Sequence, residues 1–94
     1  MPINVTVPAA IRSVVGNQAT VAIEGATVQE VVDALTTKYP ELGKRIYDGD
    51  PAARNLKRSI NLYVNDEDIR FLDNWKTALK NGDELTILLA IAGG

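Results

Sequence analysis

The sequence predicts an α+β fold in which one mixed sheet of about five strands wraps around one main helix. Segments near both ends of the chain alternate apolar and polar residues, which is typical of strands with one buried face. One strong amphipathic helix pattern, residues 28–38, lies between them. Because one helix cannot cover two sheets, a single sheet is expected to bury its apolar face against it.

Residues 3–7 alternate in this way and predict the first strand, which Pro8 ends. Residues 9–18 are expected to form a loop or one helical turn. Residues 19–23 alternate again and predict a second strand that ends before Gly25. The first two strands are therefore expected to form a hairpin.

The helix has the clearest start signal in the chain. Thr27 and Glu30 fit a capping box, in which the Thr27 hydroxyl accepts from the Glu30 N–H and the Glu30 carboxylate reaches back to the Thr27 N–H. Pro40 is expected to stop the helix near Lys38 or Tyr39. Its apolar stripe comprises Val28, Val31, Val32 and Leu35. We expect the stripe to pack on apolar strand residues, namely Ile3, Val5, Val21, Leu85, Ile87 and Leu89.

The middle of the chain is less regular, and a short helix over residues 42–47 followed by a long loop is expected. The basic residues of this loop are interpreted as a solvated face rather than a nucleic-acid site, because the overall charge is balanced. They are Arg54, Lys57 and Arg58. Residues 60–64 predict a third strand, residues 65–68 a turn, and Ile69 and Phe71 the start of a short return strand.

The last part of the chain predicts two turns and a central strand. Trp75 lies in the first turn and is expected at the edge of the core, while Leu79 anchors the connection. Asn81-Gly82-Asp83 forms the second turn. The final strand is apolar on both faces near its end, which favours a central position. One face carries Leu85, Ile87, Leu89 and Ile91, and the other carries Leu88 and Ala90. With this strand beside the first, the order of elements is the β-grasp arrangement of ubiquitin-like folds.

Composition excludes several kinds of function. The 94 residues suffice for one domain, residues 1–94, and ten basic against twelve acidic residues give a net charge of −2. This balance argues against nucleic-acid binding. The chain has no cysteine and no histidine, which excludes disulfides, thiolate or imidazole metal sites and any triad with a histidine base. No membrane span or signal peptide is expected, so we predict a cytoplasmic protein that is not an enzyme.

Two acidic turns could suggest metal loops, but solvated turns are the preferred interpretation because the spacing of a Ca²⁺ loop is absent. These turns are Gly82-Asp83-Glu84 and Asp66-Glu67-Asp68. No Gly-rich loop that could hold a phosphate is present either. We therefore expect no metal and no nucleotide on this chain.

The terminal Gly93-Gly94 is the feature most suggestive of function. A terminal carboxylate has a pKa of about 3.3–3.7, so it is a poor electrophile at pH 7 until it is activated, for example as an acyl-adenylate. Glycine has no side chain to obstruct a narrow enzyme passage and adopts conformations that other residues cannot. We expect the tail to be flexible or extended, reaching about 17 Å from Ala90. Leu88 and Ala90 are the candidate docking residues beside it, with Ile91, Ala92 and Gly93 threading into the partner.

The chain resembles the ThiS/MoaD family of ubiquitin-like sulfur carriers over nearly its whole length. Three segments support the resemblance: residues 27–35 with Tyr39-Pro40, the hairpin at residues 64–69, and the Gly-Asp-Glu strand that ends in Gly93-Gly94. Residues 41–58 are longer than in the smallest members, which argues against a minimal thiazole-pathway carrier. The overall pattern is most similar to carriers of a cysteine-synthesis route.

The resemblance implies that an E1-like adenylyltransferase and sulfurtransferase adenylates Gly94 with ATP, and that a sulfur donor converts it to a thiocarboxylate. It also implies a pyridoxal-phosphate-dependent cysteine synthase that forms a protein–cysteine adduct at Gly94, and a zinc metallopeptidase that releases cysteine. ATP, pyridoxal phosphate and zinc would belong to these partners, and the carrier alone would be a monomer that binds no cofactor.

Three alternatives stay open. A carrier could serve molybdopterin or thiazole synthesis instead. Activated Gly94 could be transferred to a lysine of a target, as in a ubiquitin-like protein modifier. The chain could also be a β-grasp interaction module with an idle tail. The sequence does not separate the carrier from the modifier, because both share the chemistry up to the adenylate.

Overall fold

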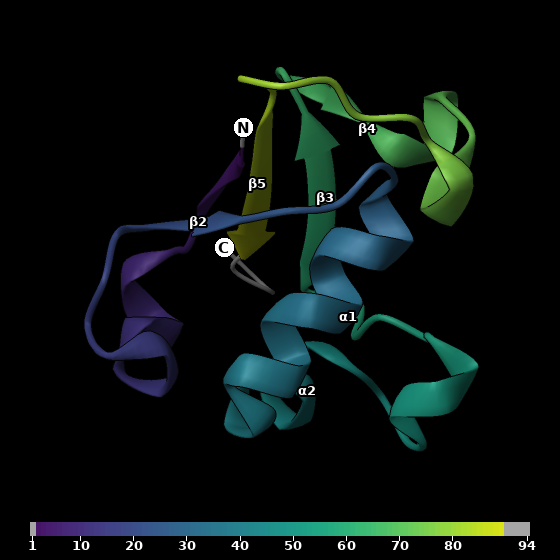
Figure 1. The fold of residues 1–94 in the computed structure, drawn as a ribbon. Helices are drawn as coiled ribbons and strands as arrows, with labels where there is room; N and C mark the ends of the chain where they lie inside the picture. Colours follow the sequence, from purple (N-terminus) through teal and green to yellow (C-terminus); the bar gives the residue numbers. More distant parts are fainter. Residues whose placement is uncertain (1, 90–94) are drawn as a thin grey trace.

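The computed structural model describes residues 2–89, and its centre is a five-stranded sheet in the order β2-β1-β5-β3-β4 (Figure 1). The strands are β1 (Ile3–Thr6), β2 (Thr20–Ile23), β3 (Ile60–Val64), β4 (Glu67–Asp68) and β5 (Glu84–Leu89). β1 and β5 run parallel and the other neighbours antiparallel. The predicted mixed sheet, with the last strand beside the first and in the centre, is therefore confirmed.

Both α-helices lie on one face of this sheet, α1 (Val28–Lys38) across it and α2 (Pro40–Ile46) after it (Figure 1). The predicted apolar stripe of α1 is buried, with Val28, Val31, Val32 and Leu35 at most 1% exposed. The strand residues that were expected to face it are also buried, except Leu89, which is only partly buried at the end of β5. Sheet and helix thus share the core that the alternation predicted.

The start of α1 follows the predicted cap in one of its two hydrogen bonds. The Thr27 hydroxyl accepts from the Glu30 N–H at 3.2 Å, but the Glu30 carboxylate accepts from the Ala26 N–H at 3.0 Å rather than from Thr27. On either side of Thr27 the chain pairs with a neighbouring loop, where the Val28 N–H donates to the Thr77 carbonyl at 3.0 Å and the Leu79 N–H to the Ala26 carbonyl at 2.8 Å. At the other end, Pro40 stops α1 at Lys38 and begins α2, where its missing N–H is not needed.

Residues 9–18 form more structure than the expected loop or single turn. Ala9–Val15 is a 3₁₀ helix that buries Ile11 and Val15 in the core. It ends at Gly16 and Asn17, whose φ angles of 67° and 61° are left-handed. Glycine and asparagine are the residues that tolerate this conformation best, and this pair turns the chain into β2.

The predicted return strand at Ile69 and Phe71 is wrong. Asn65 and Asp66, with φ angles of 48° and 74°, form a two-residue turn, so the strand begins at Glu67 and ends at Asp68. The Asp68 carboxylate then accepts from the Arg70 N–H at 2.9 Å, which starts a 3₁₀ helix over Ile69–Phe71. This local hydrogen bond competes with strand pairing, as aspartate side chains commonly do.

Asp68 should make stability sensitive to acid. The residue is 5% exposed, and its carboxylate accepts hydrogen bonds from the Arg70 guanidinium at 2.6 and 3.1 Å. These bonds, together with that from the Arg70 N–H, hold the pKa of Asp68 below its ordinary value of 3.8. A lowered folded-state pKa gives stability that is present above the unfolded value and is lost as pH falls through the folded value.

We therefore expect the melting temperature to fall as pH decreases below about 4, and Asp68→Asn to flatten this dependence. The variant should be less stable at pH 7, because Asn keeps an acceptor for the Arg70 N–H but loses the ion pair. Thermal melts followed by circular dichroism between pH 2 and 7 would measure the melting temperature of the parent chain and the variant as a function of pH. Asp48→Asn is the control, since Asp48 is exposed and has no ion pair within residues 2–89. Identical acid profiles for Asp68→Asn and the parent would contradict the prediction.

Candidate functional site

The sheet face away from the helices carries Leu88, the sequence-predicted docking residue within the described chain. Leu85 and Ile87 of β5 point into the core, so Leu88 lies on the opposite face, where its side chain is 42% exposed. Its direct partner across β3 is Asn61. On the β1 side, the same face of β5 continues with Thr86, which pairs with Thr6. Leu88 is thus an exposed apolar group among polar neighbours, as a docking anchor would be.

The remaining predicted site residues, Ala90, Ile91, Ala92, Gly93 and Gly94, lie outside the described residues. β5 is described up to Leu89, which pairs with Ile60. The expected flexible tail and the predicted continuation of the strand to Ile91 are therefore untested. The described strand places Gly94 five positions beyond a residue fixed in the sheet.

The acidic turn before β5 is used for structure. The Asp83 carboxylate accepts from the Lys80 N–H at 2.8 Å and from the Asn65 side-chain amide at 3.0 Å, and these bonds lower the pKa of Asp83. The Asn65 side-chain oxygen, Oδ1, in turn accepts from the Glu84 N–H at 3.0 Å. Gly82 takes a φ of 88°, which suits glycine. This network joins the β3–β4 turn to the start of β5 and so fixes the strand that carries Leu88.

The described residues hold no group of three or more acidic, histidine or cysteine side chains that could bind a metal ion. The second acidic turn is consistent with this, because Asp68 is engaged by Arg70. Within residues 2–89 the structure also contains no helix long and apolar enough to span a membrane.

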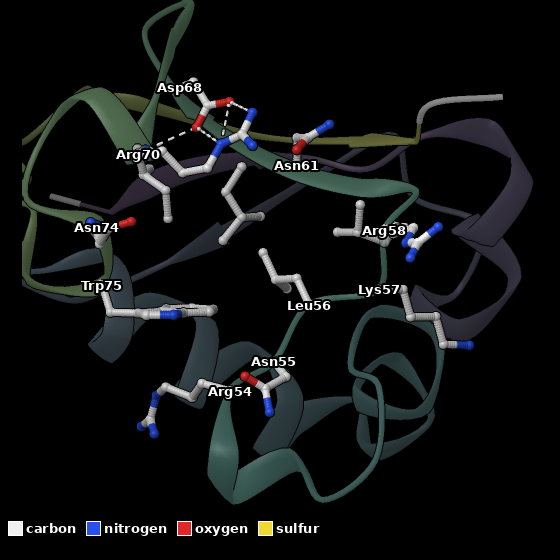
Figure 2. Close-up of a pocket in the computed structure, with 13 residues that line it drawn as sticks. Arg54, Asn55, Leu56, Lys57, Arg58, Asn61, Asp68, Arg70, Asn74 and Trp75 are labelled. Carbon is white, nitrogen blue, oxygen red and sulfur yellow. Dashed lines mark hydrogen bonds and ion pairs between the residues drawn. The ribbon is translucent and has the colours of Figure 1, made fainter. Parts of the chain in front are cut away.

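Sequence reasoning missed one cavity, a groove of about 370 Å³ on the helix side of the sheet beside β3 (Figure 2). Three segments line it: residues 54–58, residues 60–62 of β3, and residues 68–70 together with Asn74 and Trp75. The loop before β3 lies against α2 through a bridge between Tyr47 and Leu56. The cluster of basic residues in this loop was the one sequence feature that pointed to this surface. The local sequence does not show that β3 and Trp75 complete a cavity with them.

Arg54 departs from the predicted solvated face. It forms an ion pair with Asp33 of α1, and its guanidinium carbon lies 6.0 Å from the centre of the Trp75 ring. Tyr47 also packs near Trp75, with ring centres 6.2 Å apart, and burial raises the pKa of its hydroxyl, with a smaller contribution from Asp33. Trp75 is partly buried at the core edge, as predicted. Of the basic cluster, Lys57 and Arg58 are exposed, whereas Arg54 is half-buried.

Comparisons with known proteins agree with this geometry. A model of the ThiS family matches residues 5–94. The sulfur carrier protein CysO of Mycobacterium tuberculosis is 38% identical over 94 residues, which cover all of both chains. A chain in a crystal structure of the Amycolatopsis orientalis BexX/CysO complex is also similar, with a TM-score of 0.83 and 38% identity over 98% of this chain and 99% of that one.

A third similar protein has a different name. The solution structure of small archaeal modifier protein 1 from Methanosarcina acetivorans has a TM-score of 0.82 and 35% identity, covering 98% of this chain and 95% of that one. The β-grasp fold is therefore common to proteins named as sulfur carriers and as modifiers.

Proposed function

The chain belongs to the ThiS family, and we propose that it is a sulfur carrier that works through the carboxylate of Gly94. The observation that supports this most strongly is the 38% identity to curated sulfur carriers over the full length of both chains. The proteins it resembles are small ubiquitin-like carriers rather than enzymes, and this chain is likewise not an enzyme. In this proposal its side chains stabilise the fold and form a docking face, and the reaction takes place at the carboxylate of Gly94.

In the proposed reaction a partner enzyme activates Gly94. A Gly94 carboxylate oxygen attacks the α-phosphorus of ATP, and pyrophosphate leaves. Hydrosulfide supplied by a sulfur donor then attacks the acyl carbon of the resulting adenylate and gives up its proton to solvent, and AMP leaves with the electron pair of the broken C–O bond. The product is a thiocarboxylate, and its sulfur is a better nucleophile than the oxygens of the original carboxylate. The sulfur bonds to a later acceptor, and hydrolysis of the acyl bond that joins this adduct to Gly94 returns the carboxylate of the carrier.

The proposed partners follow from this sequence of steps. An E1-like adenylyltransferase would bind the ATP and deliver sulfur. A pyridoxal-phosphate-dependent cysteine synthase would form a cysteine adduct at Gly94, and a zinc metallopeptidase would release the cysteine. All cofactors would be bound by these partners, in the cytoplasm. The existence of a complex between a CysO protein and BexX supports a partner protein for this chain, without identifying which one.

Leu88 is the proposed anchor for partner docking. Specific interfaces bury roughly 800 Å² per partner, so the last few residues alone are too small to specify an enzyme. Leu88→Asp should weaken binding to the activating enzyme or the cysteine synthase by at least about 2 kcal/mol, a hot-spot-sized loss. The fold should survive, because the side chain is already 42% exposed.

Calorimetric titration alongside thermal melting would measure this effect. Ala22→Asp is the matched control, because Ala22 is exposed on the same sheet face but lies on the outer strand β2. Unfolding of the Leu88 variant would mean that Leu88 belongs to the core. Equal loss of binding in both variants, or in neither, would place the docking surface elsewhere.

The similarity to a small archaeal modifier protein favours one second candidate, transfer of activated Gly94 to a lysine of a target protein. The two functions share the adenylate and differ in product. Incubation with the E1-like partner, ATP and a sulfur donor, followed by intact mass spectrometry, would separate them. A sulfur atom in place of a terminal oxygen supports the carrier, and an isopeptide-linked conjugate supports the modifier. Conjugates alone, with no sulfur-loaded chain, would refute the carrier proposal.

A further inference from the structure

The groove beside β3 has an apolar floor and a polar rim (Figure 2). Its floor is formed by side chains from the loop, the sheet and the 3₁₀ segment, namely Leu56, Ile60, Leu62, Ile69 and Trp75. Leu56 and Trp75 are only partly buried, so they remain accessible to a ligand. The amide side chains of Asn55 and Asn74 also line the groove and offer hydrogen-bond donors and acceptors (Figure 2).

Charge is distributed very unevenly between this groove and the rest of the chain. Four of the ten basic residues line it, Arg54, Lys57, Arg58 and Arg70, but only one of the twelve acidic residues does, Asp68. The remainder of the chain therefore carries 10 − 4 = 6 basic and 12 − 1 = 11 acidic residues. A positive surface on an otherwise acidic molecule attracts a negatively charged partner and orients it.

Two of these four cations already form ion pairs with carboxylates of this chain. Arg70 is paired with Asp68, and Arg54 with Asp33. Lys57 and Arg58 are exposed, and neither makes an ion pair within residues 2–89. Both lie at the same end of the groove, beyond Leu56 (Figure 2). The groove thus offers apolar contacts along its floor and two free positive charges at one end.

The edge of the sheet adjoins the groove. β4 pairs only with Tyr63 and Val64, so Ile60–Leu62 of β3 has a strand neighbour on the β5 side alone. These residues line the groove. An uncovered stretch of strand edge favours an occupant that is itself an extended chain, because such a segment can lie alongside the strand.

We propose that this groove binds an extended acidic segment of a partner protein. An apolar side chain of the segment lies on the floor against Leu56 and Trp75, and its carboxylates pair with Lys57 and Arg58. The acidic remainder of the chain repels a polyanion such as RNA, which favours a protein segment that carries a few carboxylates. The floor of the groove lies on the helix side of the sheet, whereas Leu88 faces the other way, and the two surfaces approach each other at Asn61, which lines the groove and pairs with Leu88.

The probe for this surface is a short amphipathic peptide, acetyl-Glu-Leu-Glu-Leu-Glu-amide. Trp75 is the only tryptophan of the chain and lies in the groove, so its fluorescence reports binding directly. We expect a saturable shift of its emission that weakens with added salt. Peptides with Gln for Glu, or with Ala for Leu, should each bind at least tenfold more weakly, because one lacks the charges and the other the apolar anchors.

The double variant Lys57→Glu/Arg58→Glu should bind the acidic peptide at least tenfold more weakly than the parent chain. Lys38→Glu/Lys80→Glu changes the charge equally at exposed sites outside the groove and should bind within about twofold of the parent. Thermal melting checks that both variants fold. Absence of saturable binding at millimolar peptide, equal binding of the Gln peptide, equal effects of the two double variants, or tighter binding of a single-stranded RNA oligomer would each overturn the proposal. None of these outcomes depends on whether Gly94 accepts sulfur.

Discussion

Removal of Gly94 should abolish thiocarboxylate formation while leaving the melting temperature nearly unchanged. The shortened chain still ends in a carboxylate, but one that stops about 3.4 Å short of the nucleotide. Displacement of a reacting group by about 1 Å can cost 100-fold in rate, so we expect a loss of at least that size. The core is formed by residues up to Leu89, so it should fold as before.

Addition of one alanine after Gly94 is the complementary change. It moves the carboxylate past the reaction centre and adds a side chain where the passage is expected to be narrow. Both variants are assayed with the E1-like enzyme, ATP and a sulfur donor, and the product is read by intact mass spectrometry. If either variant accepts sulfur at its new terminus at the parent rate, the terminal-acyl mechanism is wrong.

Replacement of Ile87 by Ala should destabilise the protein by about 2–5 kcal/mol. Ile87 is 1% exposed, lies on the central strand and pairs with Leu62 of β3, which is equally buried. Removal of three side-chain carbons there costs transfer free energy and leaves a cavity that the strands on both sides cannot fill. For a chain of this size such a loss is a large part of the total stability.

Urea denaturation would measure the free energy of unfolding of this variant. Thr86→Ala is the matched control, since Thr86 is the preceding residue on the other face of β5 and is partly exposed. We expect the control to change stability by about 0.5 kcal/mol or less. A change of that small size for Ile87→Ala would show that its side chain is not in the core.

The elements that could be predicted from the sequence are those whose signal is local. The period-2 alternation of β1, β2, β3 and β5 and the stripe of α1 each record directly which face is buried. A single mixed sheet could also be predicted, because one main helix cannot cover two sheets. The exposed face of β5 could also be predicted, because Leu88 alternates with Leu85 and Ile87.

The features that were missed depend on competition or on distant parts of the chain. The return strand is short because the Asp68 carboxylate captures the Arg70 N–H, and a pattern of apolar residues does not register such a bond. Arg54 was predicted to be a surface charge. Its ion pair with Asp33 forms only when α1 and the loop before β3 come into contact, although the two residues are 21 positions apart in the sequence. The groove likewise exists only once residues 54–58 and 68–75 are folded together.

Intact mass spectrometry of the protein isolated from its native cells tests the central claim most directly. The sulfur-carrier function predicts a fraction of molecules heavier by the difference between one sulfur and one oxygen atom. Fragmentation should place this difference at Gly94, and alkylation should mark the thiocarboxylate. A population in which Gly94 is either an unmodified carboxylate or joined to the lysine of another protein, with no sulfur in any molecule, would contradict it.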